Sequence, residues 1–174
     1  MSGYFLESAR LGFRCWQPSD LPIALALWSD PLVTRYISAK GFGAHEIETR
    51  LALEIANQRA HGIQYWPVFL LAGGEHVGCC GLRSREPDVP EFGVHIASRH
   101  WRRGYAFEAG LRVIDYAFSV RKASALFAGH NPANDASRAL LSRLGFVHTH
   151  DELYPPTGLR HPSYLLSHPA RQAP

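Results

Sequence analysis

Residues 91–109 combine the residue types that a phosphate-binding loop needs. An apolar strand pattern over residues 91–96 leads through a short loop into a helical pattern that begins at Gly104. The first N–H groups of a helix lack internal acceptors and lie at the positive end of its dipole, and small residues such as Gly104 and Ala106 let a phosphate approach. Three arginines add charge-assisted donors: Arg99, Arg102 and Arg103. The segment predicts a pyrophosphate site, with a plain packing turn and solvated arginines as the alternative.

Other phosphate and metal signatures are absent from the sequence. It contains neither the G-x-x-x-x-G-K-[ST] loop of nucleoside triphosphatases nor the G-x-G-x-x-G dinucleotide fingerprint. The cysteines Cys15, Cys79 and Cys80 show no C-x-x-C spacing, and the 10 histidines form no H-E-x-x-H motif. We therefore expect no metal site and no disulfide scaffold.

The composition is that of one globular domain. A length of 174 residues predicts a single domain over residues 1–174, with residues 169–174 as a frayed tail. Hydrophobic residues make up 46% of the chain and charged residues 19%, which excludes intrinsic disorder. The net charge of +3 is too small for a dedicated nucleic-acid binder but is compatible with a local anion pocket. With no signal-peptide pattern and no apolar run of ~20 residues, we expect a cytoplasmic protein.

The elements that must position the loop alternate between strands and helices. Strand patterns cover residues 11–17, 65–72, 76–82, 91–96, 125–129, 146–153 and 163–167. Helices are predicted from Ser19 or Asp20, from Asp30-Pro31, and over residues 44–59, 104–119 and 134–144. Gly62 is expected to end the third helix, Asn134 to cap the last one, and Gly145 to close it. This order predicts a mixed α/β (α+β) chain around one central sheet.

At this point the sequence resembles a known family. Arg103-Gly104-Tyr105-Ala106 with Glu108-Ala109 is similar to the acyl-CoA pyrophosphate loop, [QR]-x-x-G-x-[GA], of the GCN5-related N-acetyltransferases (GNAT). The sequence pattern W-x-x-G-Y-A-x-E-A is closer to the ribosomal-protein N-terminal acetyltransferase branch. Further matching segments, from residue 11 to residue 166, are Leu11-Gly12-Phe13-Arg14, Gly78-Cys79-Cys80-Gly81-Leu82, Asn131-Pro132-Ala133-Asn134-Asp135-Ala136-Ser137 and Leu144-Gly145-Phe146. Trp101 departs from the motif's first Gln or Arg, which shifts polar side-chain contacts onto Arg102, Arg103 and Arg99.

The resemblance implies a GNAT fold and acetyl-CoA as the cofactor. That fold has a mixed, mostly antiparallel sheet of about seven strands, flanked by about four helices and splayed between the strands at residues 91–96 and 125–129. The pantetheine arm would lie in this gap and pair with backbone near Ile96 and Ala97. The residues expected at the cofactor are Ile96, Ala97, Arg102, Arg103, Gly104, Tyr105, Ala106, Phe107, Asn134 and Ser137.

The implied chemistry is direct attack of a primary amine on the acetyl thioester, which needs a base for the amine's proton. Glu91 is the first candidate base, acting through a water, with an ordinary strand-start charge as the alternative. His95 shares its strand face and is a second candidate, or a structural histidine. By analogy Asn134 contacts the pantetheine as well as capping its helix, and Ser137 faces the thiol or is simply solvated. Many family members use a tyrosine acid on the last helix, but residues 134–144 contain none.

The acceptor stays open at this stage. A protein N-terminal amine, a polyamine, an amino sugar or an amino acid would serve, and the branch resemblance favours the first and implies a homodimer. Acidic residues that would attract a cationic amine, or form a solvated surface, are Asp88, Glu91, Asp151 and Glu152. Two other functions are weighed: a non-catalytic acyl-CoA-binding module of the same fold, and a nucleic-acid or phosphoprotein binder that uses the arginines. We expect neither a nucleic-acid partner nor a membrane partner.

Overall fold

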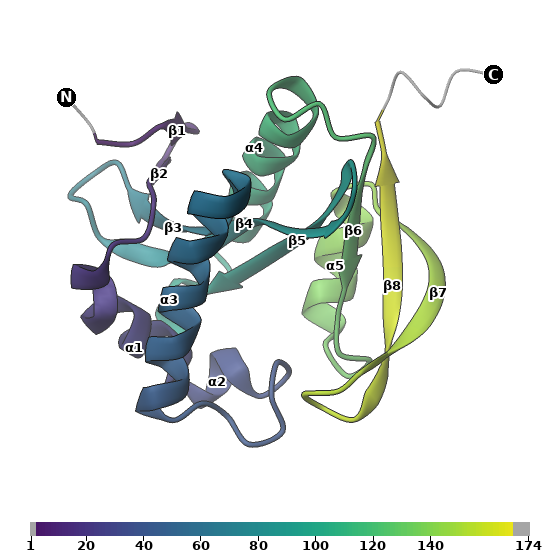
Figure 1. Cartoon of the computed structure of the whole chain (residues 1–174), viewed down its shortest axis with the longest axis horizontal. Helices are drawn as coiled ribbons and strands as arrows, with labels where there is room; N and C mark the ends of the chain where they lie inside the picture. Colours follow the sequence, from purple (N-terminus) through teal and green to yellow (C-terminus); the bar gives the residue numbers. More distant parts are fainter. Residues whose placement is uncertain (1–2, 169–174) are drawn as a thin grey trace.

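A single eight-stranded sheet organises the protein in the computed structural model, which describes residues 3–168 (Figure 1). The strands are β1 (Leu6–Glu7), β2 (Leu11–Phe13), β3 (Tyr65–Leu70), β4 (His76–Glu86), β5 (Val89–Ile96), β6 (Ala125–Gly129), β7 (Val147–Tyr154) and β8 (Leu159–Ser167). Their order across the sheet is β1-β2-β3-β4-β5-β6-β8-β7. All neighbours run antiparallel except β5 and β6, which are parallel. The predicted mixed, mostly antiparallel sheet is confirmed.

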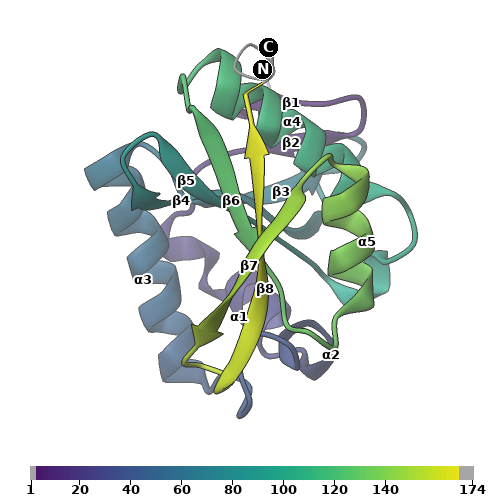
Figure 2. The ribbon, with the colours of Figure 1, turned by 90° about the vertical axis from the view of Figure 1, so that its right-hand side faces the viewer.

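Helices cover both faces of this sheet, as the two orthogonal views show (Figures 1 and 2). The helices are α1 (Leu21–Trp28), α2 (Pro31–Thr34), α3 (Ala44–His61), α4 (Tyr105–Ser119) and α5 (Asp135–Arg143), with short 3-10 turns η1 (Pro18–Asp20) and η2 (Ser98–His100). One buried cluster joins α4 and α5 to the sheet, and a second joins α1, α2 and α3 to the opposite face. None of the helices described here is long and apolar enough to cross a membrane.

Local signals set the helix ends as the sequence predicted. Gly62 adopts φ 69° directly after α3, and Gly145 adopts φ 91° close behind α5. The Asn134 side chain accepts a hydrogen bond from the Ser137 N–H at 3.1 Å, so it is the N-cap of α5. The Asp30 side chain caps α2 in the same way through the Leu32 N–H. These ends are predictable because each depends on one residue and its near neighbours.

Several strands differ in extent from the prediction, and one was missed. The strand expected over residues 11–17 ends at Phe13, because Arg14 binds the Asp20 carboxylate through two nitrogens at 2.7 and 2.8 Å and the chain leaves the sheet. β1 was missed, since two residues are too short for a periodic pattern. β8 begins at Leu159 rather than at residue 163, and it includes Pro162, which usually argues against a strand. The predicted tail at residues 169–174 lies outside the described residues.

The parallel pair β5–β6 opens toward its carboxyl ends. Only one pair of residues is in register between these strands, Glu91 with Phe127. Beyond that pair β5 continues to Ile96 and then to α4, whereas β6 continues to Gly129 and then to α5. A gap at the carboxyl ends of parallel strands is a common ligand position in open α/β sheets. The predicted splay between these strands is thus present, with two helix N-termini beyond its open end.

Candidate active site

The loop between β5 and α4 takes a left-handed path into the helix. Arg102 has φ 62° and Gly104 has φ 82°, and α4 begins at Tyr105. Left-handed backbone is easy for glycine but costly for other residues, so the Gly104 position requires its residue type. Arg102 and Arg103 are exposed, while the first-turn N–H groups of Tyr105, Ala106 and Phe107 lack intrahelical acceptors. The loop therefore presents two exposed positive side chains beside free helix-end donors.

Contacts from distant elements hold this loop in place. The Arg10 Nη1 donates to the Arg103 carbonyl at 3.1 Å, and its guanidinium lies 4.6 Å from the centre of the Tyr105 ring. Arg10 also pairs with Glu108 at 2.7 Å, and Ser8 donates to the same carboxylate. Burial alone would raise the pKa of Glu108, but these hydrogen bonds lower it overall. Glu108 is thus an anchor of the first turn of α4.

Trp101, which departs from the family motif, has a structural partner. Its indole Nε1 donates to the Ile96 carbonyl at 2.8 Å, although the side chain is 41% exposed. The contact fastens the loop back onto the end of β5. Tryptophan at this position therefore stabilises the turn and leaves polar contacts with a ligand to neighbouring residues.

The open edge of β5 presents unpaired backbone groups to the gap. The Ala97 N–H donates to the Val77 carbonyl at 2.9 Å and its carbonyl accepts from the His100 N–H at 2.9 Å, so both groups of Ala97 are used. Backbone groups alternate in direction along a strand, so those of Val94 and Ile96 point away from β4. The Ile96 carbonyl accepts from the Trp101 indole, which leaves the Ile96 N–H and the groups of Val94 for a ligand in the gap. Of the two residues predicted to pair with pantetheine, Ile96 faces the gap, while Ala97 lies beside it.

Asn134 and Ser137 lie on the first turn of α5, beyond the carboxyl end of β6. The Asn134 Oδ1 is occupied by the cap bond to the Ser137 N–H, which leaves the amide nitrogen available as a donor. Ser137 is half-buried. Among the described residues no hydrogen bond joins Ser137 to Glu91 or His95, so the structure keeps the predicted residues in separate groups on the two sides of the gap.

Glu91 is held by a tyrosine that the sequence analysis did not single out. The Tyr65 hydroxyl donates to Glu91 Oε1 at 3.1 Å. Tyr65 is in register with Gly81, and Gly81 with Gly93, so this row of the sheet has no other side chains. A Cβ on Gly93 would overlap the end of the Tyr65 ring and lie 2.6 Å from its Cε2. The glycine at 93 therefore gives the ring room to reach Glu91.

A buried ion pair supports Tyr65 from the other side. Glu54, which is fully buried, pairs with Arg83 and accepts from the Tyr65 N–H at 2.9 Å. The Arg83 guanidinium lies over the Tyr65 ring, 4.1 Å from its centre. Burial, and then the charge of Glu91, raises the pKa of the Tyr65 phenol well above its ordinary value. Tyr65 therefore stays protonated and donates to Glu91 at neutral pH.

His95 lies on the same strand face but is fixed as a neutral acceptor. Its Nδ1 accepts a hydrogen bond from the Trp28 indole at 3.2 Å, which places the ring proton on Nε2. Burial, and then the charges of Arg50 and Arg83, lowers the pKa of His95 well below its ordinary value. To act as a base, Nδ1 of His95 would have to give up its hydrogen bond from Trp28 before it could take up a proton. The geometry therefore favours Glu91 over His95 as a base.

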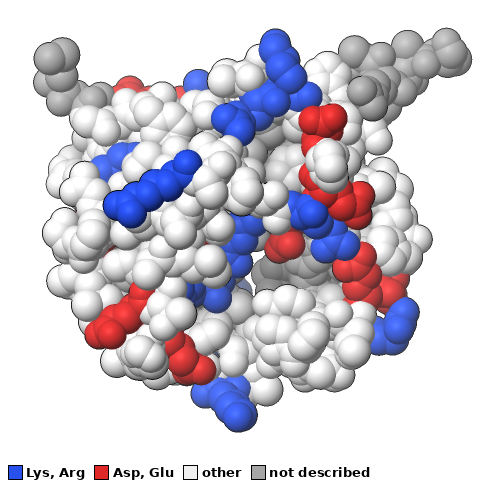
Figure 3. All heavy atoms as spheres, in the orientation of Figure 1, with Lys and Arg blue, Asp and Glu red and all other residues white. Residues whose placement is uncertain are grey.

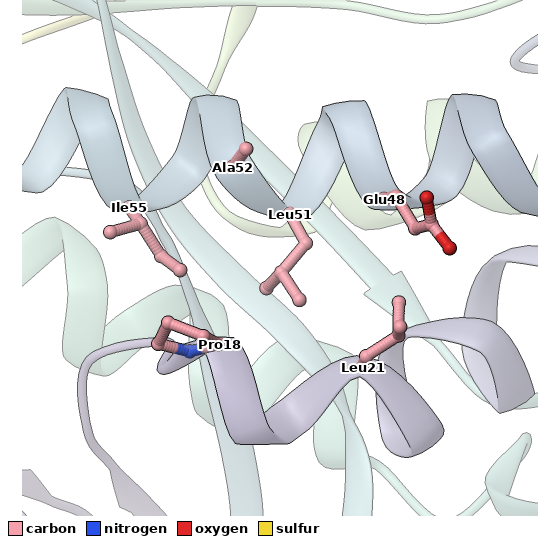
Figure 4. Close-up of a pocket in the computed structure, with 6 residues that line it drawn as sticks. All are labelled: Pro18, Leu21, Glu48, Leu51, Ala52 and Ile55. Atoms are coloured by element: carbon pink, nitrogen blue, oxygen red, sulfur yellow. The ribbon is translucent and has the colours of Figure 1, made fainter.

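A shallow apolar groove between η1–α1 and α3 lies apart from this site. Its lining residues, shown in Figure 4, are Pro18, Leu21, Glu48, Leu51, Ala52 and Ile55. No residue of β5, of the loop before α4 or of α5 lines it. Within residues 3–168, no group of three or more His, Cys, Asp or Glu side chains is placed to hold a metal ion. Cys79 and Cys80 are buried residues of β4.

Comparisons of the sequence with known proteins agree on one family. The family model described as "Acetyltransferase (GNAT) domain" matches residues 10–147. The uncharacterized N-acetyltransferase YoaA of Bacillus subtilis (strain 168) is 31% identical over 148 residues, covering 81% of each chain. The uncharacterized N-acetyltransferase p20 of Bacillus licheniformis is 28% identical over 145 residues, again covering 81% of each.

Solved structures show the same fold at low sequence identity. A GNAT-family acetyltransferase from Bacillus anthracis aligns with a TM-score of 0.80 at 20% identity, covering 93% of this chain and 97% of that one. A putative ribosomal-protein-serine acetyltransferase from Vibrio cholerae gives 0.78 at 20% identity, covering 96% and 99%. Spermidine N-acetyltransferase from Vibrio cholerae, in complex with CoA and spermine, gives 0.75 at 17% identity, covering 90% and 95%. The chain thus belongs to the GNAT family of acetyltransferases, and the prediction of an N-acetyltransferase is confirmed.

Proposed function

We propose that the protein transfers the acetyl group of acetyl-CoA to a primary amine by direct attack. The observation that carries this proposal is the opening of β5 from β6 with the N-terminus of α4 at its mouth. Bound acetyl-CoA would supply a thioester carbonyl, to which the amine nitrogen bonds as the carbon–sulfur bond breaks and CoA leaves as the thiol. Related acetyltransferases crystallised with CoA support this choice of acyl donor.

The residues of the loop and gap fit this donor. The N–H groups of Tyr105, Ala106 and Phe107 and the side chains of Arg102 and Arg103 would hold the pyrophosphate. A side chain at Gly104 would strain the left-handed backbone at this position. A bulky side chain there should also block the approach of a phosphate to the N-terminus of α4. The N–H of Ile96, whose carbonyl accepts from Trp101, would pair with the pantetheine beside Ala97, as in strand addition. The amide nitrogen of Asn134 would donate to the same arm.

Within this proposal Glu91 is the base that removes the amine's proton, through a water. Tyr65 is a positioning residue, because its hydroxyl fixes one carboxylate oxygen and leaves the other free. Ser137 would donate a proton toward the departing thiolate from the far side of the gap. General acid–base steps of this kind contribute roughly 10²–10⁴-fold in rate. His95 is retained as a second candidate, which a variant can separate from Glu91.

Release of free CoA thiol from acetyl-CoA in the presence of an amine panel tests this function. We expect release with at least one primary amine, and a kcat lowered about 100-fold in Glu91→Gln with unchanged acetyl-CoA affinity. Glu86→Gln, an exposed carboxylate on the adjacent strand, is the matched control and should keep full activity. Tight acetyl-CoA binding with no release across the panel would favour a non-catalytic acyl-CoA-binding module.

Finer properties also remain proposals. We propose a cytoplasmic protein with a single domain over residues 1–174 that forms a homodimer, following the branch resemblance. Size-exclusion chromatography with light scattering measures the assembly directly. A mass of 19.4 kDa for the particle in solution would contradict the dimer.

A further inference from the structure

Arg50 is a partly buried cation that lacks a counter-charge. It lies on α3, one turn before Glu54, and its guanidinium stacks over Trp28 at 5.0 Å and Phe42 at 5.1 Å from the ring centres. Its Nε is buried and has no hydrogen-bond partner. Across residues 3–168, no carboxylate forms an ion pair with it. The guanidinium therefore has unused donors in a setting that favours a negative charge.

Three other arginines that hold elements of the fold together each pair with a carboxylate. Arg83 pairs with Glu54, Arg14 with Asp20 and Arg10 with Glu108.

Burying a charge without a partner is unfavourable, and an arginine fork is well matched to an oxyanion. Burial, followed by the positive charge of Arg83, lowers the pKa of Arg50. A bound anion would compensate the charge of Arg50.

Arg50 belongs to the same cluster as the candidate base. Trp28, on which Arg50 stacks, donates to His95, and the His95 ring lies edge-on to Tyr65 at 5.8 Å. Tyr65 in turn donates to Glu91. Figure 3 shows a hollow on this face, between α3 and the β7–β8 end of the sheet, with basic side chains along its α3 side. Direct contacts through Trp28, His95 and Tyr65 thus link Arg50 to Glu91.

A tyrosine on β7 is affected by the charges of both Arg50 and Glu91. Tyr154, at the end of β7, is half-buried, and its ring stacks on His161 at 4.5 Å. Burial raises the pKa of Tyr154, while Arg50 and Arg83 on one side and Glu91 on the other act on it through their charges. Arg50 and Glu91 thus have opposite effects on the pKa of one phenol.

We propose that the acceptor is a small amine that bears a carboxylate, such as an amino acid, and that Arg50 binds this carboxylate while the amine faces Glu91. This inference rests on the proposed function and names its substrate class. A polyamine fits less well, because the charge of Arg50, which no ion pair compensates, repels it. Two of the acidic residues expected to attract one are engaged: Glu152 with Arg85 and His150, and Asp151 with His148.

Matched pairs of acceptors test the proposal. Purified protein is assayed for CoA thiol release with α-amino acids, with their α-carboxamides, with spermidine and with a tripeptide that has a free N-terminus. The carboxamide keeps the size and the amine but removes the charge. Its less basic amine is more often neutral, which works against the expected preference. We expect kcat/KM for the best amino acid to exceed that of its amide by at least about 10-fold.

Variants of Arg50 then locate the preference. Arg50→Gln should lower kcat/KM for the amino acid roughly 10- to 100-fold, mainly through KM, and for the amide less than ~3-fold. Arg59→Gln, an exposed arginine on the same helix, is the control and should change neither. If Arg50→Gln melts below the assay temperature, Arg50→Lys carries the test. It keeps the charge but loses the fork, so KM for the amino acid should still rise several-fold.

The outcomes separate the inference from the proposed function. Release with amides, spermidine or the tripeptide at rates equal to or above those with amino acids overturns the carboxylate site alone, and so does an equal loss of both acceptors in Arg50→Gln. No release with any amine, despite an intact fold, contradicts the transferase itself and this inference with it.

Discussion

Substituting Gly93 with alanine should displace the tyrosine that positions Glu91. Gly93 has ordinary strand backbone, so alanine causes no backbone strain there. Its Cβ would overlap the end of the rigid Tyr65 ring, which Arg83 and the main chain of β3 hold in place. The ring must therefore tilt away from β5, and its hydrogen bond to Glu91 is lost.

The size of the effect follows from these contacts. Overpacking of one methyl group against a rigid ring should cost about 2 kcal/mol of unfolding free energy. For a chain of this length that lowers Tm by ~4–8 °C. Because the carboxylate loses its fixed orientation, kcat/KM should fall roughly 10- to 100-fold, while acetyl-CoA affinity stays unchanged.

Two further variants make the interpretation specific. Gly110→Ala is the control, because its Cβ would lie 2.9 Å from the flexible end of Leu144 and 3.4 Å from the Phe92 ring, on the face of the sheet that α4 covers. It should lower Tm without lowering activity. Tyr65→Leu with Gly93→Ala should recover part of the lost Tm but none of the activity. If Gly93→Ala kept both wild-type Tm and wild-type kcat/KM, the argument that the ring is fixed between Gly93 and Glu91 would be refuted.

The remaining predictions concern stability and are checked by thermal unfolding. Glu54→Gln leaves Arg83 without its buried partner and should cost about 3–5 kcal/mol, whereas a Tm within 2 °C of wild type, against the ~6–20 °C expected, would contradict this. Asn134→Ala removes the cap of α5 and should cost about 1 kcal/mol, which an unchanged Tm would contradict. Burial lowers the pKa of His76 to about 4, so the unfolded chain binds more protons between that pH and about 6.5. Stability should therefore fall as the pH drops through this range, by up to roughly 3 kcal/mol, and His76→Phe should flatten the decline. An identical acid profile in that variant would assign the loss to other groups.

Much of the fold follows from short stretches of sequence. The ends of α3 and α5 depend on Gly62, Asn134 and Gly145, each of which acts on its own turn. The strand, loop and helix around Gly104 are contiguous, so their order could be predicted before their positions in space were known. β2 was overextended because the interaction that ends it, Arg14 with Asp20, is a side-chain contact that no periodic pattern encodes.

The site around Glu91 required the register of the sheet. Tyr65 and Glu91 lie 26 positions apart and meet only because Gly81 and Gly93 align between them. Glu54 and Arg83 come from a helix and a strand whose separate patterns give no sign of an ion pair. A polar residue at a buried position of an amphipathic helix, as at Glu54, is the one signal that sequence reasoning had available there.

Arg50 shows why the role of a partly buried charged residue can be recognised only from the structure. In the sequence it is one of two arginines on a charged helix, and its spacing from Glu54 suggests an ordinary pair along the helix. In the structure Glu54 is taken by Arg83, and Arg50 is left between two aromatic rings. The missing partner is visible only after every nearby carboxylate has been accounted for.

Acetyl-CoA binding to the wild-type protein and to Gly104→Glu tests the central claim most directly. The wild type should gain roughly 2.7 kcal/mol of stability at ~100 times the dissociation constant, a Tm increase of ~5–10 °C that acetate and adenosine do not reproduce. In Gly104→Glu the carboxylate occupies the approach to the α4 N-terminus, so the increase should vanish while far-UV circular dichroism stays native. An equal Tm increase in both proteins, or none in the wild type at millimolar acetyl-CoA, would contradict the assignment of this loop as the CoA site.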